Sequence, residues 1–185
     1  MIPPTDGPLG VEAATTERYW PFLTVRYGMS EHTVRELKSE AEWRVAFPVM
    51  KQLRTHLDEE AFVSLVGRLQ VDGYRLFGLF EAGDGDRDGG GDSDGDGDLR
   101  AVAGVAIEHT LYDGRRVWVY DLVTDEAHRS RGLGEELYSF VERWAGDRGC
   151  ETVTLSSNLE RSDAHRFYEE RLGMERARYV FKRDL

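Results

Sequence analysis

The sequence contains one cysteine, three lysines and no long apolar run. The single cysteine, Cys150, excludes an internal disulfide and supplies no cysteine-rich metal cluster. No stretch is long and apolar enough to span a bilayer, and the first residues lack the basic and apolar regions of a signal peptide. We therefore expect a cytoplasmic protein that makes no contact with a membrane.

Acidic residues outnumber basic ones, and lysine is scarce among the basic residues. The chain of 185 residues carries a formal net charge of −11, which argues against a nucleic-acid-binding surface. Only Lys38, Lys51 and Lys182 are lysines, and all other basic residues are arginines. An acidic, lysine-poor surface suits a high-salt cytoplasm, so a halophilic source is our working hypothesis.

Two stretches carry little sign of regular structure. Residues 1–30 hold four of the five prolines, and we expect a flexible N-terminal extension. Residues 83–98 are rich in glycine and aspartate, and we expect an acidic, disordered insertion within the single domain formed by residues 31–185. Part of this insertion matches the first half of a calcium-binding loop, but Ala103 stands at the twelfth position instead of glutamate, so we expect no metal.

Two common phosphate-binding patterns are missing as well. The P-loop pattern GxxxxGK[ST] does not occur, and the dinucleotide pattern GxGxxG fails because Leu137 occupies its third glycine position. Present instead are a strand-like run at residues 117–124, VWVYDLVT, a short basic loop at residues 129–134, RSRGLG, and a run of helical spacing, EELYSFVERWA. Strand, basic glycine loop and helix form an anion-binding geometry, because the first-turn N–H groups of a helix lack internal partners.

The residue types in this loop suit a phosphate. Gly132 and Gly134 permit positive φ and let a ligand approach the backbone closely. Arg129 and Arg131 add positive charge suited to phosphate oxygens. The loop therefore predicts a ligand that carries phosphate.

Arg129, Gly132 and Gly134 match the pattern [QR]xxGxG, and AHRFYEERLGM follows further downstream. With the strand before the loop and the helix after it, this stretch resembles the pyrophosphate-binding motif of the GNAT superfamily of acyl-CoA-dependent N-acyltransferases. The resemblance extends from about Tyr74 to Leu185, and more weakly back to Thr33. It implies transfer of an acetyl group from acetyl-CoA to an amine by direct attack, without an acyl-enzyme and without a metal.

The order of the expected elements predicts an α+β fold with a mixed, centrally splayed sheet flanked by helices, as in GNAT folds. We expect a strand at residues 33–37 and two helices, the first begun by a capping box of Ser39 and Glu42 and kinked or divided at Pro48. The remaining expected elements are a second helix capped by Asp58, strands at 74–81, 101–110, 117–124 and 151–156, a helix at 133–146, a helix capped by Ser162, and a last strand through Ala177, Tyr179 and Phe181.

The resemblance also implies site residues. Tyr168 aligns with the usual general acid of the family, and a phenol can donate its proton to a leaving thiolate. The implied cofactor-binding residues are Leu122, Val123, Thr124, Arg129, Ser130, Arg131, Gly132, Leu133, Gly134, Asn158 and Phe167. The backbone of Leu122, Val123 and Thr124 is expected to be unpaired, so that it can bond the pantetheine amides and hold the thioester oxygen.

The general base stays open. The family often places a glutamate on the central strand, but Trp118 occupies that position and cannot act as a base. Glu108 and Asp121 are our catalytic candidates, with Glu126, His109 or a chain of water molecules as alternatives. Because Trp118 replaces the glutamate, a non-catalytic acyl-CoA-binding or regulatory module is the alternative function. The expected partner is an amine of unknown identity, with a homodimer as an open alternative and no nucleic acid.

Overall fold

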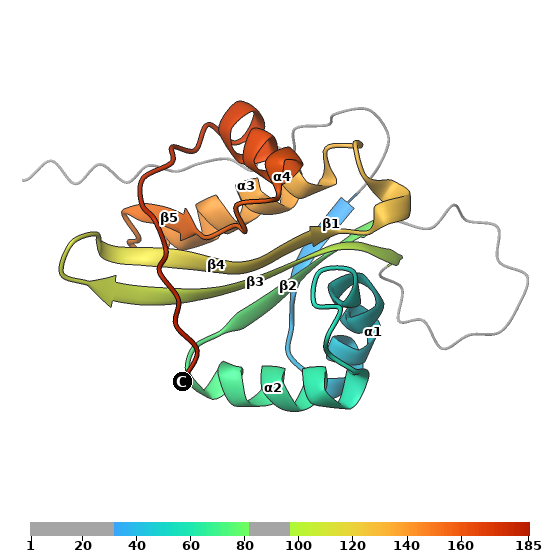
Figure 1. The fold of residues 1–185 in the computed structure, drawn as a ribbon. Coiled ribbons are helices and arrows are strands. Elements are labelled where there is room, and N and C mark those ends of the chain that lie inside the picture. The colour runs from blue at the N-terminus through green and yellow to red at the C-terminus, as the bar shows by residue number, and fades with distance from the viewer. Residues whose placement is uncertain (1–31, 82–96) are drawn as a thin grey trace, which may run out of the picture.

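The computed structural model describes residues 32–81 and 97–185. The expected N-terminal extension and the acidic insertion up to residue 96 lie outside the described residues. Within the described part, five strands form one sheet in the order β1-β2-β3-β4-β5 (Figure 1). Their bounds are β1 His32–Leu37, β2 Arg75–Glu81, β3 Asp98–Thr110, β4 Gly114–Thr124 and β5 Thr152–Leu155. The first four strands are antiparallel to their neighbours and β5 is parallel to β4, which confirms the predicted mixed sheet.

Helices cover both faces of the sheet. Helix α1, Glu40–Lys51, and helix α2, Glu59–Val71, lie on one face. Helix α3, Leu133–Gly146, and the short helix α4, Ser162–Arg166, lie on the other face (Figure 1). A 3₁₀ turn, Glu126–His128, follows β4, and a π-helical turn, Phe167–Arg171, follows α4.

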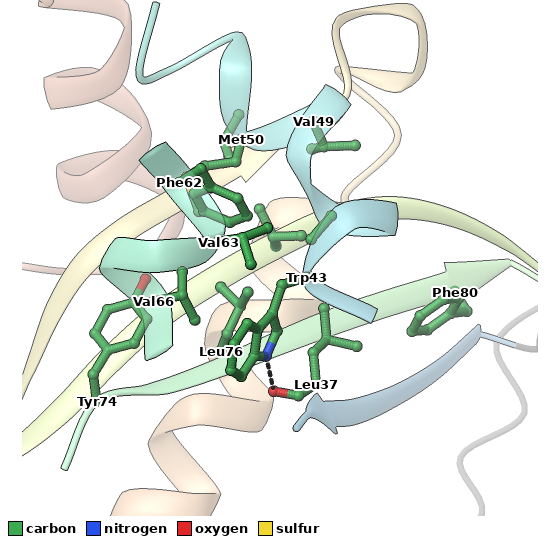
Figure 2. Packing of buried hydrophobic residues seen from close by; sticks show 13 residues of the cluster. Leu37, Trp43, Val49, Met50, Phe62, Val63, Val66, Tyr74, Leu76 and Phe80 are labelled. Atoms are coloured by element: carbon green, nitrogen blue, oxygen red, sulfur yellow. Dashed lines mark hydrogen bonds between the residues drawn. The ribbon is translucent and has the colours of Figure 1, made fainter. Parts of the chain in front are cut away.

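Each face of the sheet has its own apolar core. On the α1 and α2 face, the Trp43 indole N–H donates to the Leu37 carbonyl at 3.0 Å and thereby fixes α1 on the end of β1 (Figure 2). On the α3 face, Leu133, Leu137 and Val141 are almost fully buried at helical spacing. The end of β4 lies between the two cores, since Val123 belongs to the first and Leu122 packs against the second.

The start of α1 is the predicted capping box. The Ser39 hydroxyl accepts from the Glu42 N–H, and the Glu42 carboxylate accepts from the Ser39 N–H at 2.9 Å. Burial raises the pKa of Glu42, but the N–H groups of Lys38 and Ser39, the Ser39 hydroxyl and the Arg35 guanidinium outweigh burial and lower that pKa to about 2. The ionised carboxylate therefore stabilises this end of the helix.

Replacing Glu42 by glutamine should lower the free energy of unfolding by about 1 kcal/mol near neutral pH. The folded-state pKa of Glu42 is depressed, so its contribution is complete above the ordinary value of 4.5 and is lost as pH falls toward about 2. Urea unfolding of the wild type and of Glu42→Gln at pH 7 and pH 3 measures this contribution. The difference in free energy of unfolding between the two proteins should be smaller at pH 3. A difference that does not change with pH would contradict the assignment.

Three sequence predictions need correction, the first of them only in part. Of the predicted kink or division at Pro48, the division does not occur: helix α1 continues to Lys51, because proline costs the helix only the hydrogen bond to the Arg44 carbonyl while packing holds both halves. Ser162 is the first residue of α4 and not its cap, since Arg161 precedes it without a capping side-chain bond.

The third error concerns the last strand. Residues 172–185 form no strand, and the Tyr179 and Phe181 side chains are exposed. An alternating pattern shows that a segment has one apolar face, but a strand also needs a neighbouring edge to pair with. Among the described residues this segment pairs with no strand, and an ion pair from Arg178 to Asp113 joins it to the β3–β4 turn instead.

Candidate active site

The loop at residues 129–134 leads directly into α3. Ser130 has φ 62° and Gly132, the residue before the helix, has φ 84°. Left-handed residues in such a turn aim successive backbone N–H groups toward one side, which makes a concave anion site. Leu133 is 1% exposed and pins the first turn of α3 to the core, so the loop is held on a rigid support.

The helix start is open to a ligand. Gly132 has no side chain, so the first-turn N–H groups receive no capping bond from it. A Cβ on Gly134 would lie 3.2 Å from the Thr124 Oγ1 and 3.4 Å from the Phe167 ring. The end of β4, the start of α3 and the π-helical turn therefore meet at one place.

The two loop arginines bond to the protein itself. The Arg129 Nε donates to the Thr124 carbonyl at 3.3 Å, which ties the loop to the end of β4. Arg131 donates to the Glu81 carboxylate at 2.6 Å, and Arg100 donates to its other oxygen. The Arg131 bond lowers the pKa of Glu81 against a smaller opposing effect of burial, and Arg100 adds to the lowering. Both guanidinium groups thus tie the loop to its neighbours, one to the end of β4 and the other to the end of β2.

The predicted splay between the central strands is present. Pairing of β4 with β5 begins at Arg116 with Thr152 and ends at Val119 with Leu155. Leu122, Val123 and Thr124 pair with β3 on one side only. On the side toward β5, no strand formed by residues 32–81 and 97–185 pairs with their backbone groups, which leaves the open edge that an extended amide chain requires.

Asp121 lies inside a buried polar network. Its side chain accepts from the Arg54 Nε at 2.7 Å and from the Tyr74 hydroxyl at 2.8 Å. Burial and the nearby Asp121 charge raise the pKa of Tyr74, so its phenol remains a donor. A Cβ on Gly104, the register partner of Asp121, would lie 1.7 Å from that hydroxyl. Both oxygens of this predicted catalytic carboxylate are therefore engaged within the fold.

Glu108 lies on the same face of the sheet as Asp121, and its side chain is partly exposed. One of its oxygens accepts from the Tyr120 hydroxyl at 2.7 Å, and the other accepts from Arg116 at 2.8 Å. Burial raises the pKa of Glu108, but the bonds from Tyr120 and Arg116 outweigh burial and lower it. Burial and the bond to Glu108 raise the pKa of Tyr120 to about 12. Glu108 is thus an ionised carboxylate beside an aromatic side chain that is 44% exposed.

Tyr168 lies beside Phe167 in the π-helical turn. The two rings meet edge to face with centroids 5.7 Å apart, and the Tyr168 side chain is half-buried. Burial raises the pKa of Tyr168 more than the nearby Arg161 charge lowers it. The phenol therefore keeps its proton through neutral pH, as a general acid must.

The other predicted residues bond to partners outside this junction. Asn158 is exposed, and its side chain accepts from the Glu160 N–H at 3.3 Å in the turn before α4. His109 contacts Arg115 near the β3–β4 turn, and the Glu126 N–H donates to the Gln52 side chain. Arg54, Tyr74 and Gly104 were missed from the sequence, although a glycine inside a strand does indicate a close approach.

Two further observations bear on the class of site. In residues 32–81 and 97–185, no helix is long and apolar enough to cross a bilayer. In the same ranges, no group of three or more histidine, cysteine, aspartate or glutamate side chains is placed to hold a metal ion.

Comparison with known proteins gives consistent results. The model of the acetyltransferase (GNAT) family matches residues 54–174. The uncharacterized N-acetyltransferase YhdJ of Bacillus subtilis is 34% identical over 151 residues, which cover 81% of this chain and 96% of the relative. The aminoalkylphosphonate N-acetyltransferase of Salmonella typhimurium is 38% identical over 50 residues, which cover 27% of this chain and 32% of that protein.

Solved structures share the fold. The aminoglycoside N-acetyltransferase AAC(6')-Iy in complex with CoA superposes with a TM-score of 0.67 at 20% identity, covering 84% of this chain and 96% of that chain. The glucosamine-6-phosphate N-acetyltransferase of Arabidopsis thaliana has a TM-score of 0.60 at 19% identity, covering 83% and 98% of the two chains. The family model matches, the Bacillus subtilis relative is matched over 96% of its own length, and solved structures share the fold. We conclude that this chain belongs to the acetyltransferase (GNAT) family and is an acyl-CoA-dependent N-acetyltransferase.

Proposed function

We propose that this enzyme transfers the acetyl group of acetyl-CoA to an amine by direct attack, at the junction of β4, α3 and the π-helical turn. The observation that carries the proposal is the meeting of three features there. They are the half-paired end of β4, the uncapped start of α3 and the Phe167–Tyr168 pair.

The residues present suit the two halves of coenzyme A. The backbone N–H groups of Gly132, Leu133 and Gly134 lie at the positive end of the α3 dipole and would bind the pyrophosphate. The side of Leu122, Val123 and Thr124 that pairs with no described strand would bond the pantetheine amides as an added strand, with the Thr124 carbonyl already bonded to Arg129. A backbone N–H of this segment would hold the thioester oxygen as negative charge develops on it.

The protons must balance in the transfer step. The amine lone pair attacks the thioester carbonyl carbon, and the C–S bond breaks as the new C–N bond becomes an amide. The leaving thiolate takes the Tyr168 phenolic proton, whose raised pKa keeps it in place beforehand. The attacking nitrogen loses its extra proton to water, and water returns a proton to the Tyr168 phenolate. The ionised Glu108 carboxylate, which accepts from the Tyr120 hydroxyl, would attract the positively charged amine.

The acceptor would enter over two aromatic side chains of β4, the half-buried Trp118 and the exposed Tyr120. Trp118 and Tyr120 have ring centroids 6.2 Å apart, and Tyr120 stands at the position where β4 leaves β5. The Trp118 ring is already contacted by the Arg116 guanidinium, 4.6 Å from its centroid. The Tyr120 ring, tilted against Trp118 and bonded to the Glu108 carboxylate, would therefore attract an ammonium group by charge and by cation–π attraction. The relatives are named for different amines, among them aminoalkylphosphonates and aminoglycosides, so we propose an amine here without choosing among these classes.

A thiol-release assay with acetyl-CoA and a broad panel of amines tests the proposal. Direct attack needs both substrates bound together, so double-reciprocal plots at several amine concentrations should intersect. Replacing the single cysteine, Cys150, by alanine should leave the rate unchanged, since no acyl-enzyme is formed. Parallel plots, or a variant that retains no activity, would contradict direct attack.

A further inference from the structure

The strand that forms the proposed pantetheine site contains a bulge. The β3–β4 register passes from Val105 opposite Val119 to Gly104 opposite Asp121, so Tyr120 has no partner on β3. Pairing with β5 ends at the same residue, Val119. A bulge bends its strand and increases the local twist, so this extra residue is the point at which β4 turns away from β5.

Arg54, in the turn that follows α1, contacts both residues of the bulge. Its Nε donates to the Asp121 carboxylate at 2.7 Å, and its Nη2 donates to the Tyr120 carbonyl at 2.9 Å. The Tyr120 carbonyl and the Asp121 side chain are thus bridged by one planar guanidinium. The compact ammonium of a lysine could not make this pair of bonds at fixed spacing.

The other end of the same segment is also held from α1. The Gln52 side-chain amide donates to the Asp125 carboxylate at 3.0 Å, and its oxygen accepts from the Glu126 N–H at 2.8 Å. Gln52 and Arg54 are only two residues apart, yet they reach opposite ends of the stretch that includes Leu122, Val123 and Thr124. The α1 end therefore fixes this stretch at its start and at its finish.

The network behind Arg54 is costly for a fold that needs only stability. Asp121 is 8% exposed and Tyr74 is 6% exposed, so one charged group and one hydroxyl have been removed from water. Apolar side chains of similar volume often stabilise such a position as well or better. A polar network does, however, fix the position of the backbone to which it bonds. Gly104 leaves the space that the Tyr74 hydroxyl needs in this network.

We propose that Gln52 and Arg54 are positioning residues for the acetyl transfer, acting as a two-point clamp on β4. They hold Leu122, Val123 and Thr124 so that the unpaired side of the strand stays open and aligned for the pantetheine arm. The inference rests on the proposed function, because it assumes that these strand residues receive pantetheine. It assigns Asp121 to the support of Arg54 instead of proton transfer.

Two variants and two matched controls test the clamp. Gln52→Ala and Arg54→Gln each release one end of the segment. Gln70→Ala removes a single side-chain bond, to the Leu37 carbonyl, and Arg44→Gln removes surface ion pairs between α1 and α2. Neither control residue contacts β4 through these bonds. Gln52 supplies a readable variant even if loss of Arg54 leaves too little folded protein.

Comparing the affinities for two ligands distinguishes the clamp from a general loss of stability, which would weaken the binding of both. The first ligand is acetyl-CoA, and the second is the 3′-phosphorylated ADP half of coenzyme A, which has no pantetheine. Both clamp variants should weaken acetyl-CoA binding by about tenfold or more, since small displacements of a positioning group have effects of this size or larger. Their affinity for the nucleotide should stay within about twofold of wild type, and the controls should change neither value.

The opposing results are distinct. Clamp variants that bind acetyl-CoA as wild type does, or that lose both ligands equally, would overturn the clamp without contradicting the proposed function of the wild-type protein. Wild-type protein that binds neither ligand would contradict the proposed cofactor site, and the clamp with it. The pH–rate profile of Asp121→Asn decides the role of Asp121. If the rate of the variant is lower but still falls at low pH as in wild type, Asp121 has a positioning role. If the fall in rate at low pH disappears, Asp121 is the general base and its assignment here is overturned.

Discussion

Replacing Tyr168 by phenylalanine should lower kcat by about 10²-fold, the size of effect expected when a general acid is removed. The ring and its edge-to-face contact with Phe167 remain, so the packing of the π-helical turn is preserved. Only the phenolic proton is lost, and the thiolate must then leave unprotonated or take a proton from water. Acetyl-CoA affinity, measured by calorimetry, should stay within about threefold of wild type because ground-state contacts are unchanged.

Tyr138→Phe is the matched control for this change. Tyr138 is a buried tyrosine of α3 whose hydroxyl bonds to Glu142, so its removal deletes a phenolic proton outside the junction. The control should affect stability only and leave kcat unchanged. Equal losses of kcat in both variants would show that the Tyr168 hydroxyl acts through folding, and an unchanged kcat in Tyr168→Phe would show that it is not the acid.

Replacing Gly132 by aspartate should weaken acetyl-CoA binding by at least about 10²-fold, because juxtaposed like charges cost several kcal/mol. The new carboxylate would stand where the pyrophosphate meets the start of α3. A Cβ on Gly132 meets nothing within 4 Å, so steric conflict inside the protein is not the cause. The substitution does place a side chain at φ 84°, which strains the backbone by about 1 kcal/mol.

Gly149→Asp separates the strain from the charge. Gly149 follows the other end of α3 with φ 72°, and a Cβ there also meets nothing within 4 Å. Both variants should therefore lose similar stability in thermal unfolding, while only Gly132→Asp loses acetyl-CoA in calorimetry. A Gly132→Asp protein that binds acetyl-CoA as tightly as wild type would show that the phosphates lie elsewhere.

Local signals in the sequence were sufficient for much of the fold. The Ser39–Glu42 capping box, the Asp58 cap and the helix from Leu133 to Gly146 are all found where the sequence predicted them. Each is decided by bonds or by apolar spacing within a few residues of the chain. The loop before α3 was predicted for the same reason, since its two glycines and its place between a strand and a helix are local features.

Features that depend on distant contacts were not predictable in this way. The bonds to Asp121 come from Arg54 and Tyr74, which are 67 and 47 residues away in sequence. The sequence therefore presented Asp121 as an available carboxylate, and only the fold shows that both its oxygens are bonded. Gly104 was the one local indication, because a glycine inside a strand leaves room for something to approach.

The final segment, residues 172–185, shows the same limit of local sequence patterns, because here a strand was predicted that does not form. Alternation of Ala177, Tyr179 and Phe181 indicates which face of the chain is apolar but not whether an edge is available to pair with it. The segment is instead held by Arg178, which forms an ion pair with Asp113 and lies 4.4 Å from the centre of the Tyr112 ring. Pairing partners are a property of the whole sheet, and periodicity within one segment does not contain them.

Hydrogen–deuterium exchange of the wild-type protein, with and without saturating acetyl-CoA, tests most directly where the cofactor binds. Backbone amides of residues 120–126 and 129–136 should become strongly protected, because pantetheine pairs with the end of β4 and the phosphates cover the start of α3. Amides of α1 and α2 away from Gln52 should change little. Protection confined to other segments, with residues 129–136 exchanging as fast as in the free protein, would contradict the site described here.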